Sequence, residues 1–507
     1  MPILLFIGLW AIPFAILLKD FLRFEDLSIV LDAKFLKILW FTLYQAAGST
    51  AIAFGIALLP AYYLYRKRNA LSALLESAVF IPFFLPPVST VIAFSLLFSA
   101  NGLFARLGLQ LPILYTVWAI LIAHAFYNSP IFVKYIGTAL RAIPPALEET
   151  AISEGAGRFA RFWWIEGPLV FPAIAKAFFL SFTYSFMSFA VVLNLGGLRF
   201  TTLEVAIANA LRGQFDFSRA LVYAIAQFVC LFILNALLTL VPDTSTGSPT
   251  LTLSRTRPSP ITTIGSFLYA AFEYGLVLIG LLGFCYDFWN RTFSFEPIAR
   301  LFSPEFNRRF PVVRSLFNSF AVASVAAIGS VTAAFLFGKA REKWAQRVIM
   351  PTLGVSSAFL AMSLLYLHIL YGLPFFPLLT AGYFLSTLAV AYAFMRPMVR
   401  NFPANLVESA KIDGASRFRI FRSIEWPLLF PVFAAVFFQV FAIVFGEFTL
   451  PYTMQIRDYF PLASVVNYAM NAQRYYREGA AFSALNIGIV FFLFLVSNAI
   501  IQKRRLT

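Results

Sequence analysis

Twelve mainly apolar stretches follow one another along this 507-residue chain, and they limit the folds that it can adopt. A membrane-spanning α-helix needs about 20 such residues, whereas a strand of a membrane barrel needs about 10 with strict alternation. The stretches cover residues 3–19, 38–64, 73–98, 113–136, 167–193, 219–241, 263–284, 312–337, 348–370, 375–395, 427–449 and 481–501. The sequence therefore predicts an all-α polytopic membrane protein with about twelve transmembrane helices.

The distribution of charge agrees with this interpretation. Only 12% of the residues are charged, against about 25% in soluble domains, and the net charge is +16. The basic residues form short clusters between apolar stretches rather than one basic face, which argues against nucleic-acid binding. The clusters at 66–68, 140–163, 339–347, 396–422 and 503–505 all fall on one side if both termini face the cytoplasm. The first stretch lacks a basic n-region and a cleavage pattern, so we expect it to be retained.

The chain contains an internal repeat. A shift of 259 positions pairs Glu149 with Glu408 and Gly155 with Gly414, and the match continues without a gap through Pro172 and Pro431. Between the copies lies a segment rich in Pro, Ser and Thr, which is typical of a flexible linker. We therefore predict two parallel six-helix repeats, residues 1–241 and 263–507, joined by a linker at 242–262.

The repeated polar segment reads LEETAISEGAGRF in the first copy and LVESAKIDGASRF in the second. It predicts a helix, a kink at Gly and a second helix, over residues 144–160 and 403–419. We expect an apolar face made by Phe159, Phe162 and Ile165, and a charged remainder made by Glu149, Glu154, Arg158 and Arg161. Two interpretations fit such a pair of helices: an interfacial helix in the lipid headgroups, or a knob that docks into a cytoplasmic partner.

The pattern Glu-x-Ala-x-x-x-Gly, followed about ten residues later by Ile-x-x-Pro, resembles the EAA signature of permease subunits of binding-protein-dependent type I ABC importers. The matching residues are Glu149, Ala151, Gly155, Ile165 and Pro168 in the first copy, and Glu408, Ala410, Gly414, Ile424 and Pro427 in the second. Thr150 and Ser409 depart from the expected Ala. The resemblance implies that these segments are coupling helices, each seated on one of two copies of an ATP-binding cassette subunit. It also implies a periplasmic or lipid-anchored substrate-binding protein and a location in the bacterial cytoplasmic (inner) membrane. The alternative is a secondary transporter or channel with interfacial helices.

The sequence offers no chemistry of its own. It has no GxxxxGK[ST] motif, so ATP hydrolysis is expected on partner subunits, and we expect neither an enzyme nor a cofactor. His124 and His368 fit neutral, hydrogen-bonded residues between helices better than a metal site or a proton relay. Cys230 and Cys285 lack the spacing of a disulfide framework or a metal site.

The segment SFAVVLNLGGLRFTTLEVAIANAL (188–211), followed by FDFSRALVYAIAQFVC (215–230), is similar to the first half of thiamine permeases. Thiamine is therefore the favoured cargo, ferric iron the next, and polyamines or sulfate follow. Ser188 and Glu447 are equivalent positions at the ends of corresponding spans, and they are our candidates for the translocation pathway. Glu447 either attracts a cationic cargo or lies exposed to water at the membrane surface.

Overall fold

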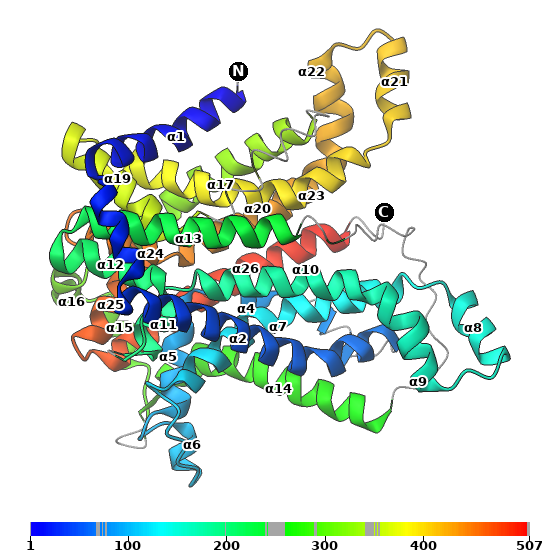
Figure 1. The fold of residues 1–507 in the computed structure, drawn as a ribbon, viewed down its shortest axis with the longest axis horizontal. Helices are drawn as coiled ribbons and strands as arrows, with labels where there is room; N and C mark the ends of the chain where they lie inside the picture. The colour runs from blue at the N-terminus through cyan, green and yellow to red at the C-terminus, as the bar shows by residue number, and fades with distance from the viewer. Residues whose placement is uncertain are drawn as a thin grey trace.

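The computed structural model describes residues 2–66, 71–72, 75–76, 79–197, 199–238, 241, 259–287, 292–339, 349, 352 and 355–503. These residues are almost entirely helical, as predicted, and the helices lie side by side in one bundle (Figure 1). One two-stranded antiparallel sheet, β1 (Tyr286–Asp287) with β2 (Thr292–Phe293), is the exception among the described residues.

The first half is built around three long helices. Helix α2 packs along α7 and both contact α10, with smaller helices at their ends. Its elements are α1 (Pro2–Phe21), η1 (Phe24–Leu31), α2 (Ala33–Arg66), α4 (Ile81–Phe84), α5 (Pro87–Phe98), α6 (Leu103–Arg106), α7 (Val117–Arg141), α8 (Pro145–Ser153), α9 (Arg158–Arg161), η2 (Phe162–Glu166), α10 (Gly167–Phe186), α11 (Ala190–Leu195), α12 (Leu203–Gln214) and α13 (Phe217–Leu238).

The second half repeats this arrangement. Helix α17 packs along α20 and both contact α23. Its elements are α14 (Pro260–Leu282), η3 (Gly283–Cys285), β1, β2, α15 (Glu296–Leu301), α16 (Pro304–Arg309), α17 (Val312–Lys339), α19 (Ser357–Tyr371), α20 (Phe375–Arg400), α21 (Ala404–Ile412), α22 (Arg417–Ile420), η5 (Phe421–Glu425), α23 (Trp426–Gly446), α24 (Thr449–Thr453), α25 (Ala463–Ala472) and α26 (Tyr476–Lys503). The bounds of α8, α9 and η2 reappear in α21, α22 and η5 after the shift of 259, so the sequence repeat is also a structural repeat.

The two halves exchange their first helices. Helix α1 contacts α19 of the second half, where Phe14 stacks on Phe359 with ring centroids 4.5 Å apart. Helix α14 contacts α2 and α5 of the first half, and the buried Glu273 accepts a hydrogen bond from Ser129 Oγ at 2.6 Å. Both contacts are with elements of the other half, so the halves are interlocked rather than joined only by their linker.

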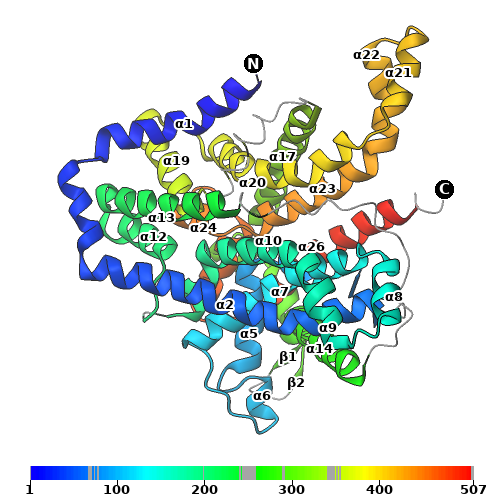
Figure 2. The ribbon, with the colours of Figure 1, turned by 45° about the vertical axis from the view of Figure 1, so that its right-hand side comes forward.

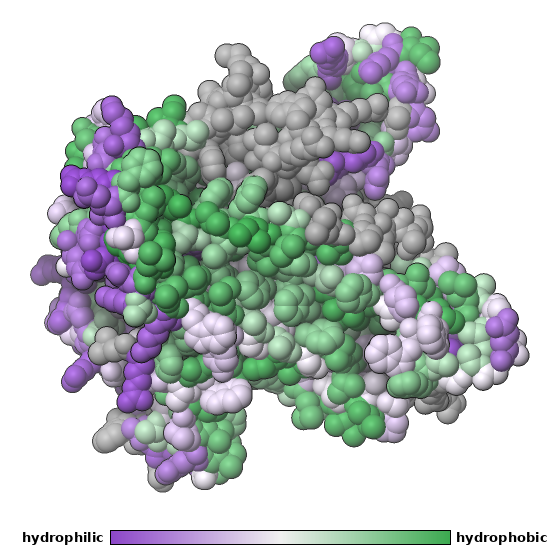
Figure 3. All heavy atoms as spheres, viewed as in Figure 1, coloured by the Kyte–Doolittle hydropathy of each residue, from purple (hydrophilic) through white to green (hydrophobic). Residues whose placement is uncertain are grey.

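Nine described helical stretches are long and apolar enough to cross a membrane. The other three predicted spans each contain a helix as well: α1, the 25-residue α7 and the 15-residue α19. Apolar side chains cover the middle of the molecule, while hydrophilic ones gather at the end formed by α12 and its neighbours (Figure 3). This banding is what a bilayer requires of a spanning protein.

Several predicted spans are broken, contrary to the expectation of continuous helices. Residues 73–98 do not form one helix: α4 and α5 are separated at Leu85–Pro86, because Pro86 lacks an N–H and forces Leu85 into an extended conformation. The predicted span 348–370 has its helix from Ser357 only. The predicted spans 167–193 and 427–449 each end early, at Phe186 and Gly446, and a short helix follows each break. Residues 242–258 of the predicted linker lie outside the described residues, and α14 begins at Pro260, inside the predicted linker.

Candidate functional site

Two helical hairpins project from the same end of the bundle, and they contain the predicted coupling motifs (Figures 1 and 2). We call residues 144–166 the first hairpin, made by α8, α9 and η2, and residues 403–425 the second hairpin, made by α21, α22 and η5. The prediction of helix, kink and second helix is confirmed in both. Each hairpin continues directly into a long helix of its half, α10 or α23, so the hairpin and that helix are one continuous element.

The kink is a Schellman turn in both hairpins. Gly155 has φ +81° and Gly414 has φ +76°, the left-handed conformation that ends many helices. Gly155 N–H donates to Ile152 O at 3.0 Å, and Ala156 N–H donates to Ala151 O at 2.8 Å. The second hairpin has the same pair of bonds, from Gly414 to Lys411 and from Ala415 to Ala410. A Cβ at either Gly meets nothing within 4 Å, so lack of space does not require Gly here, and the backbone conformation is what favours it.

The other motif residues divide into exposed and buried positions. Glu149 and Glu408 are exposed on the first helix of each hairpin, whereas Ala151 and Ala410 are buried at 7% and 9% exposure. The two Ala side chains are therefore covered by the protein, whereas the two acids face outward.

The prediction for the second arm is wrong for one residue. Phe159 and Phe162 are 77% and 49% exposed, as an apolar face that meets lipid or a partner must be, whereas Arg161 is 6% exposed and is not part of a solvated charged face. Arg161 turns inward because its Nη1 pairs with Glu148 Oε1 of the first arm at 3.1 Å. The sequence does contain a signal for this pair, because Glu148 and Arg161 are opposite charges on either side of the turn at Gly155. The prediction considered only the faces of one helix and therefore did not use it.

A π-helical turn leads from each hairpin into its long helix, η2 before Pro168 and η5 before Pro427. Pro lacks an N–H, so the regular ladder of hydrogen bonds cannot pass through these positions, and one wider turn absorbs the break. The half-buried Ile165 and Ile424 lie within these turns.

Glu166 and Glu425 end the two π turns, and they were not among the predicted site residues although the repeat pairs them. Both are buried, at 5% and 7% exposure. Glu166 Oε2 accepts a hydrogen bond from the Tyr62 hydroxyl of α2 at 3.3 Å, and Glu425 pairs with Lys339 of α17. Each carboxylate therefore ties the base of its hairpin to the corresponding long helix of the core.

At the centre of the molecule the two halves meet through a pair of equivalent aromatic rings. Phe189 and Phe448 differ by the repeat shift, and their ring centroids lie 5.8 Å apart. They are 3% and 1% exposed, so they fill the space between the halves. Tyr452 packs on both rings, with centroids 5.4 Å from Phe189 and 4.8 Å from Phe448. Across the same interface, the Arg212 guanidinium lies 3.7 Å from the Tyr452 ring centroid and donates to the Tyr452 carbonyl at 2.6 Å.

The two predicted pathway residues directly precede these rings, in the breaks between long and short helices. Ser188 is half-buried, and its carbonyl accepts a hydrogen bond from Thr202 Oγ1 at 3.4 Å. Glu447 is also half-buried rather than fully exposed at the surface. Its carboxylate accepts the N–H of Thr449 at 2.8 Å and that of Leu450 at 3.1 Å, so it caps the first turn of α24.

The histidines and cysteines do not assemble a metal site. Among the described residues no three His, Cys, Asp or Glu side chains come together in a metal-binding group. His124 is buried and its Nδ1 lies 3.2 Å from Ser49 Oγ of α2, in agreement with the predicted hydrogen-bonded His between helices. His368 bonds instead to the Leu373 carbonyl in the loop after its own helix. Cys230 and Cys285 are free thiols.

Comparison with known proteins agrees with the repeat. Residues 50–244 and 326–506 each match the family described as "Binding-protein-dependent transport system inner membrane component". The thiamine transport system permease protein ThiP of Brucella suis is 31% identical over 276 residues, which is 50% of each chain. ThiP of Escherichia coli is 31% identical over 196 residues, 38% of this chain and 37% of the relative. The sulfate transport system permease protein CysT of Salmonella typhimurium is 31% identical over 188 residues, 36% of this chain and 68% of the relative.

The matched region spans half or less of the thiamine permeases named here, although it covers two thirds of the sulfate permease. The family match, in contrast, extends over most of both halves. The chain is a fused, two-half member of the family of binding-protein-dependent transport system inner membrane components.

Proposed function

We propose that this protein is the permease subunit that carries thiamine across the bacterial inner membrane, driven by ATP hydrolysis on two copies of a separate ATP-binding subunit. An extracytoplasmic binding protein delivers the cargo, and both hairpins and both termini face the cytoplasm. The observation that carries this proposal is the pair of hairpins that project from one end with the same backbone and with an exposed Leu and an exposed acid at equivalent positions. Thiamine is placed first because relatives with that named cargo match parts of the chain at about one third identity.

A comparison of the two hairpins indicates which residues an identical partner can recognise on both. The first hairpin holds four acidic and two basic residues, and the second holds three acidic and four basic ones. Two identical subunits cannot recognise both hairpins through residues whose charge differs between them. Shared exposed residues remain: Leu147 and Leu406, 45% and 41% exposed, and the acids Glu149 and Glu408. An exposed Leu beside an exposed acid on a projecting helix fits a knob that enters an apolar groove with a polar rim.

The cargo pathway is proposed to follow the interface between the halves. Phe189 and Phe448 close that interface in this conformation, and the long helices α10 and α23 link the same region to the hairpins. Movement of the hairpins during ATP hydrolysis then separates the two rings. Parallel repeats that enclose a pathway along their shared axis are an established architecture for transport.

The test uses the full chain expressed with its ATP-binding subunit. Leu147→Asp and Leu406→Asp each place a charge where an apolar contact is proposed, and each is expected to weaken co-purification of that subunit at least tenfold. Val313→Asp, an exposed apolar position at the opposite end, is the matched control and should co-purify normally. Normal association of the Leu147→Asp, Leu406→Asp double variant contradicts docking through the hairpins.

The cargo is tested separately, by uptake of labelled thiamine in proteoliposomes that contain the complex, its binding protein and ATP. Thiamine uptake that depends on ATP and on the binding protein is the expected result. ATP hydrolysis could instead be stimulated by a binding protein loaded with sulfate or ferric iron and not by one loaded with thiamine. In that case the protein is still a transporter, but its cargo is not thiamine.

A further inference from the structure

Each half carries a basic groove at the end of the bundle opposite the hairpins. In the first half the groove lies between the start of α2, the segment before α12, and α13. Its volume is about 590 Å³, and its lining includes the bases Lys34, Lys37, Arg199 and Arg219, with no acid. Arg219 pairs with Asp216 beside the groove, whereas Lys34, Lys37 and Arg199 are exposed and have no ion-pair partner among the described residues. An external anion can therefore approach all three side chains.

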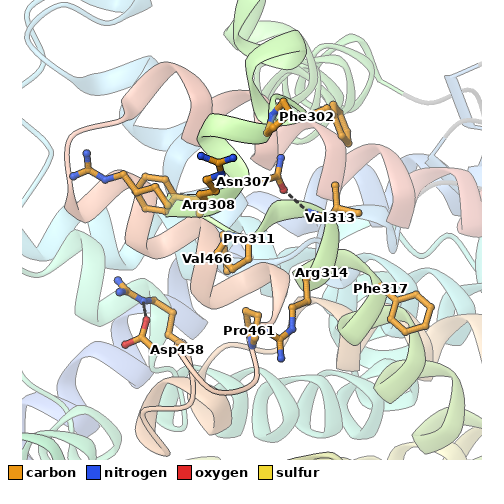
Figure 4. Close-up of a pocket in the computed structure, with 14 residues that line it drawn as sticks. Phe302, Asn307, Arg308, Pro311, Val313, Arg314, Phe317, Asp458, Pro461 and Val466 are labelled. Carbon is orange, nitrogen blue, oxygen red and sulfur yellow. Dashed lines mark hydrogen bonds and ion pairs between the residues drawn. The ribbon is translucent and has the colours of Figure 1, made fainter.

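The second half has a similar groove of about 960 Å³, between α16, the start of α17 and the segment after α24. The bases that line it are Arg308, Arg309, Arg314 and Arg457, and Asp458 is its one acid. Arg457 Nε bonds to Asp458 at 2.8 Å, and Arg309 bonds to the Tyr475 hydroxyl at 2.6 Å. Figure 4 shows Arg308 and Arg314 at this groove, with the Phe317 ring to one side.

The two grooves share two equivalent walls in the repeat, although the third wall is α13 in the first groove and α16 in the second. In the first half Thr42 Oγ1 of α2 accepts the N–H of Leu203, at the start of α12, at 3.0 Å. In the second half Ser319 Oγ of α17 accepts the N–H of Ala463, at the start of α25, at 2.9 Å. Counted back from these anchors, Lys37 and Arg314 each lie five positions earlier, and Trp40 and Phe317 each lie two positions earlier. A base and an exposed aromatic ring thus recur at the same places in a repeat whose sequence differs around them.

The location of these bases is unusual. Membrane proteins concentrate Lys and Arg on the cytoplasmic side, which we assign to the hairpin end. Four bases in a groove at the opposite end of each half run against that bias. A specific anionic ligand gives a reason for both clusters.

The surface below each groove is apolar and faces outward from the bundle. Trp40 is 69% exposed, and Tyr44, one turn further along α2, is 50% exposed. On α17, Phe317 is 74% exposed and Val325, two turns further along, is 46% exposed. Each groove therefore joins a cationic mouth to an apolar stripe that runs along a membrane-spanning helix. A soluble protein domain could contact only the cationic part. A phospholipid can contact both parts, with its headgroup at the bases and its acyl chains along the apolar stripe.

We infer that the two grooves are binding sites for an anionic phospholipid, one molecule in each half, in the leaflet opposite the hairpins. The phosphate lies between Lys37 and Arg199 in the first groove, and between Arg308 and Arg314 in the second. Trp40 and Phe317 lie at the level of the glycerol backbone, where amphipathic and aromatic rings are favoured. The side of the membrane rests on the proposed orientation, but the binding itself does not depend on transport.

The test is native mass spectrometry of the purified full chain titrated with dioleoyl-phosphatidylglycerol, with dioleoyl-phosphatidylcholine as the neutral comparison. The parent is expected to retain two molecules of phosphatidylglycerol more tightly than phosphatidylcholine. Lys34→Gln, Lys37→Gln and, separately, Arg308→Gln, Arg314→Gln are each expected to lose one of the two, with affinity at that site about thirtyfold weaker, since each of the two bases near an anionic surface contributes about 1 kcal/mol. The charge-conserving Lys34→Arg, Lys37→Arg should bind as the parent does.

The matched control removes the same charge outside the grooves, through Lys19→Gln in the last turn of α1 and Arg23→Gln just after it, and both side chains are exposed. Equal loss in this control and in the groove variants would show attraction by net charge alone and would overturn the inference. Unchanged retention in the groove variants would overturn it as well. If those variants keep phosphatidylglycerol but lose association with the binding protein, the grooves serve a protein partner instead. None of these outcomes changes with thiamine uptake, so failure here is separable from failure of the proposed function.

Discussion

The two hairpins share one backbone and differ in the side chains that hold their arms together. In the first hairpin the arms are joined by the ion pair between Arg161 and Glu148, whose side chains are 7% and 13% exposed. The same two positions of the second hairpin are Ile420, 4% exposed, and Val407. An ion pair and an apolar pair therefore occupy equivalent places between nearly identical turns.

This difference shows which features the geometry requires. The left-handed turn favours Gly, a buried Ala lies four residues before that Gly, and a Pro follows each π turn. All three features recur in both copies. The pair that fills the space between the arms has only to be complementary, because a buried ion pair can often be replaced by apolar residues of similar volume. The backbone of the hairpin is thus more constrained than the chemistry of its interior.

The largest expected effect comes from breaking the closing pair of the first hairpin on one side only. Arg161→Ile is expected to destabilise docking and folding of this hairpin, because the half-buried Glu148 carboxylate then loses its Arg161 partner. Such a loss costs about 3–5 kcal/mol in a fully buried pair, and less here because part of Glu148 is solvated. Co-purification of the ATP-binding subunit and thermal unfolding in detergent measure the two consequences.

The double variant Arg161→Ile, Glu148→Val gives the first hairpin the pair of the second, and it serves as the control. We expect it to recover most of the loss. A double variant as defective as the single one would mean that the ion pair has a role beyond joining the arms, and that the two hairpins are not interchangeable in this respect.

The next effect concerns the turn that the hairpins share. Gly155→Val and Gly414→Val each force a β-branched residue to φ near +80°, at a cost of roughly 1–2 kcal/mol per site. Because the turn presents the docking helix, we expect uptake to fall strongly in either variant and ATP hydrolysis to become independent of the binding protein, while the protein still inserts.

Asn is the discriminating control at both positions, since it tolerates the left-handed conformation although it is larger than Ala. Gly155→Asn and Gly414→Asn are expected to keep most of the activity. If Asn is as harmful as Val, the restriction is one of space in the assembled complex, and the backbone explanation is wrong.

Much of the fold follows from sequence because it depends on periodic and repeated signals. Apolar stretches of about 20 residues specify helices in a bilayer, and the shift of 259 predicts equivalent hairpins down to their bounds. The breaks were missed because hydropathy averages over a window and does not register what single residues do. Pro86 interrupts a stretch that is apolar throughout, and Glu447 ends another by capping the short helix that follows.

The hairpin motif was located from sequence, but the inward side of its second arm was not. Helical spacing placed Phe159 and Phe162 on an apolar face, and both are exposed. Arg161 was placed in water because the ion pair with Glu148 depends on two arms folding together. The contact between Phe189 and Phe448 was equally hidden, since it joins residues 259 positions apart that carry no local signal.

A smaller effect is expected from the contact that only one half makes at the central interface. The position equivalent to Arg212 is Asn471, and the position equivalent to Tyr452 is Leu193, so the cation–π contact has no counterpart. A double-mutant cycle with Arg212→Asn and Tyr452→Leu is expected to give a coupling energy of about 0.5–2 kcal/mol in thermal or denaturant unfolding. Additive effects of the two changes would mean that the contact does not help to hold the halves together.

The smallest effect tests whether Glu447 serves the cargo in addition to capping α24, where the first half has Ser188. Glu447→Gln keeps an oxygen that can accept the N–H of Thr449 or Leu450, so the unfolding temperature should stay close to that of the parent. It removes the negative charge beside the closed rings, and we expect uptake of a cationic cargo to slow about fivefold, which corresponds to roughly 1 kcal/mol. Glu447→Ala is the comparison, because it removes both the cap and the charge and should lower stability as well as uptake. If Glu447→Gln takes up limiting cargo as fast as the parent while Glu447→Ala is destabilised, Glu447 acts only as a helix cap. The difference in charge between Glu447 and Ser188 then has no role in transport.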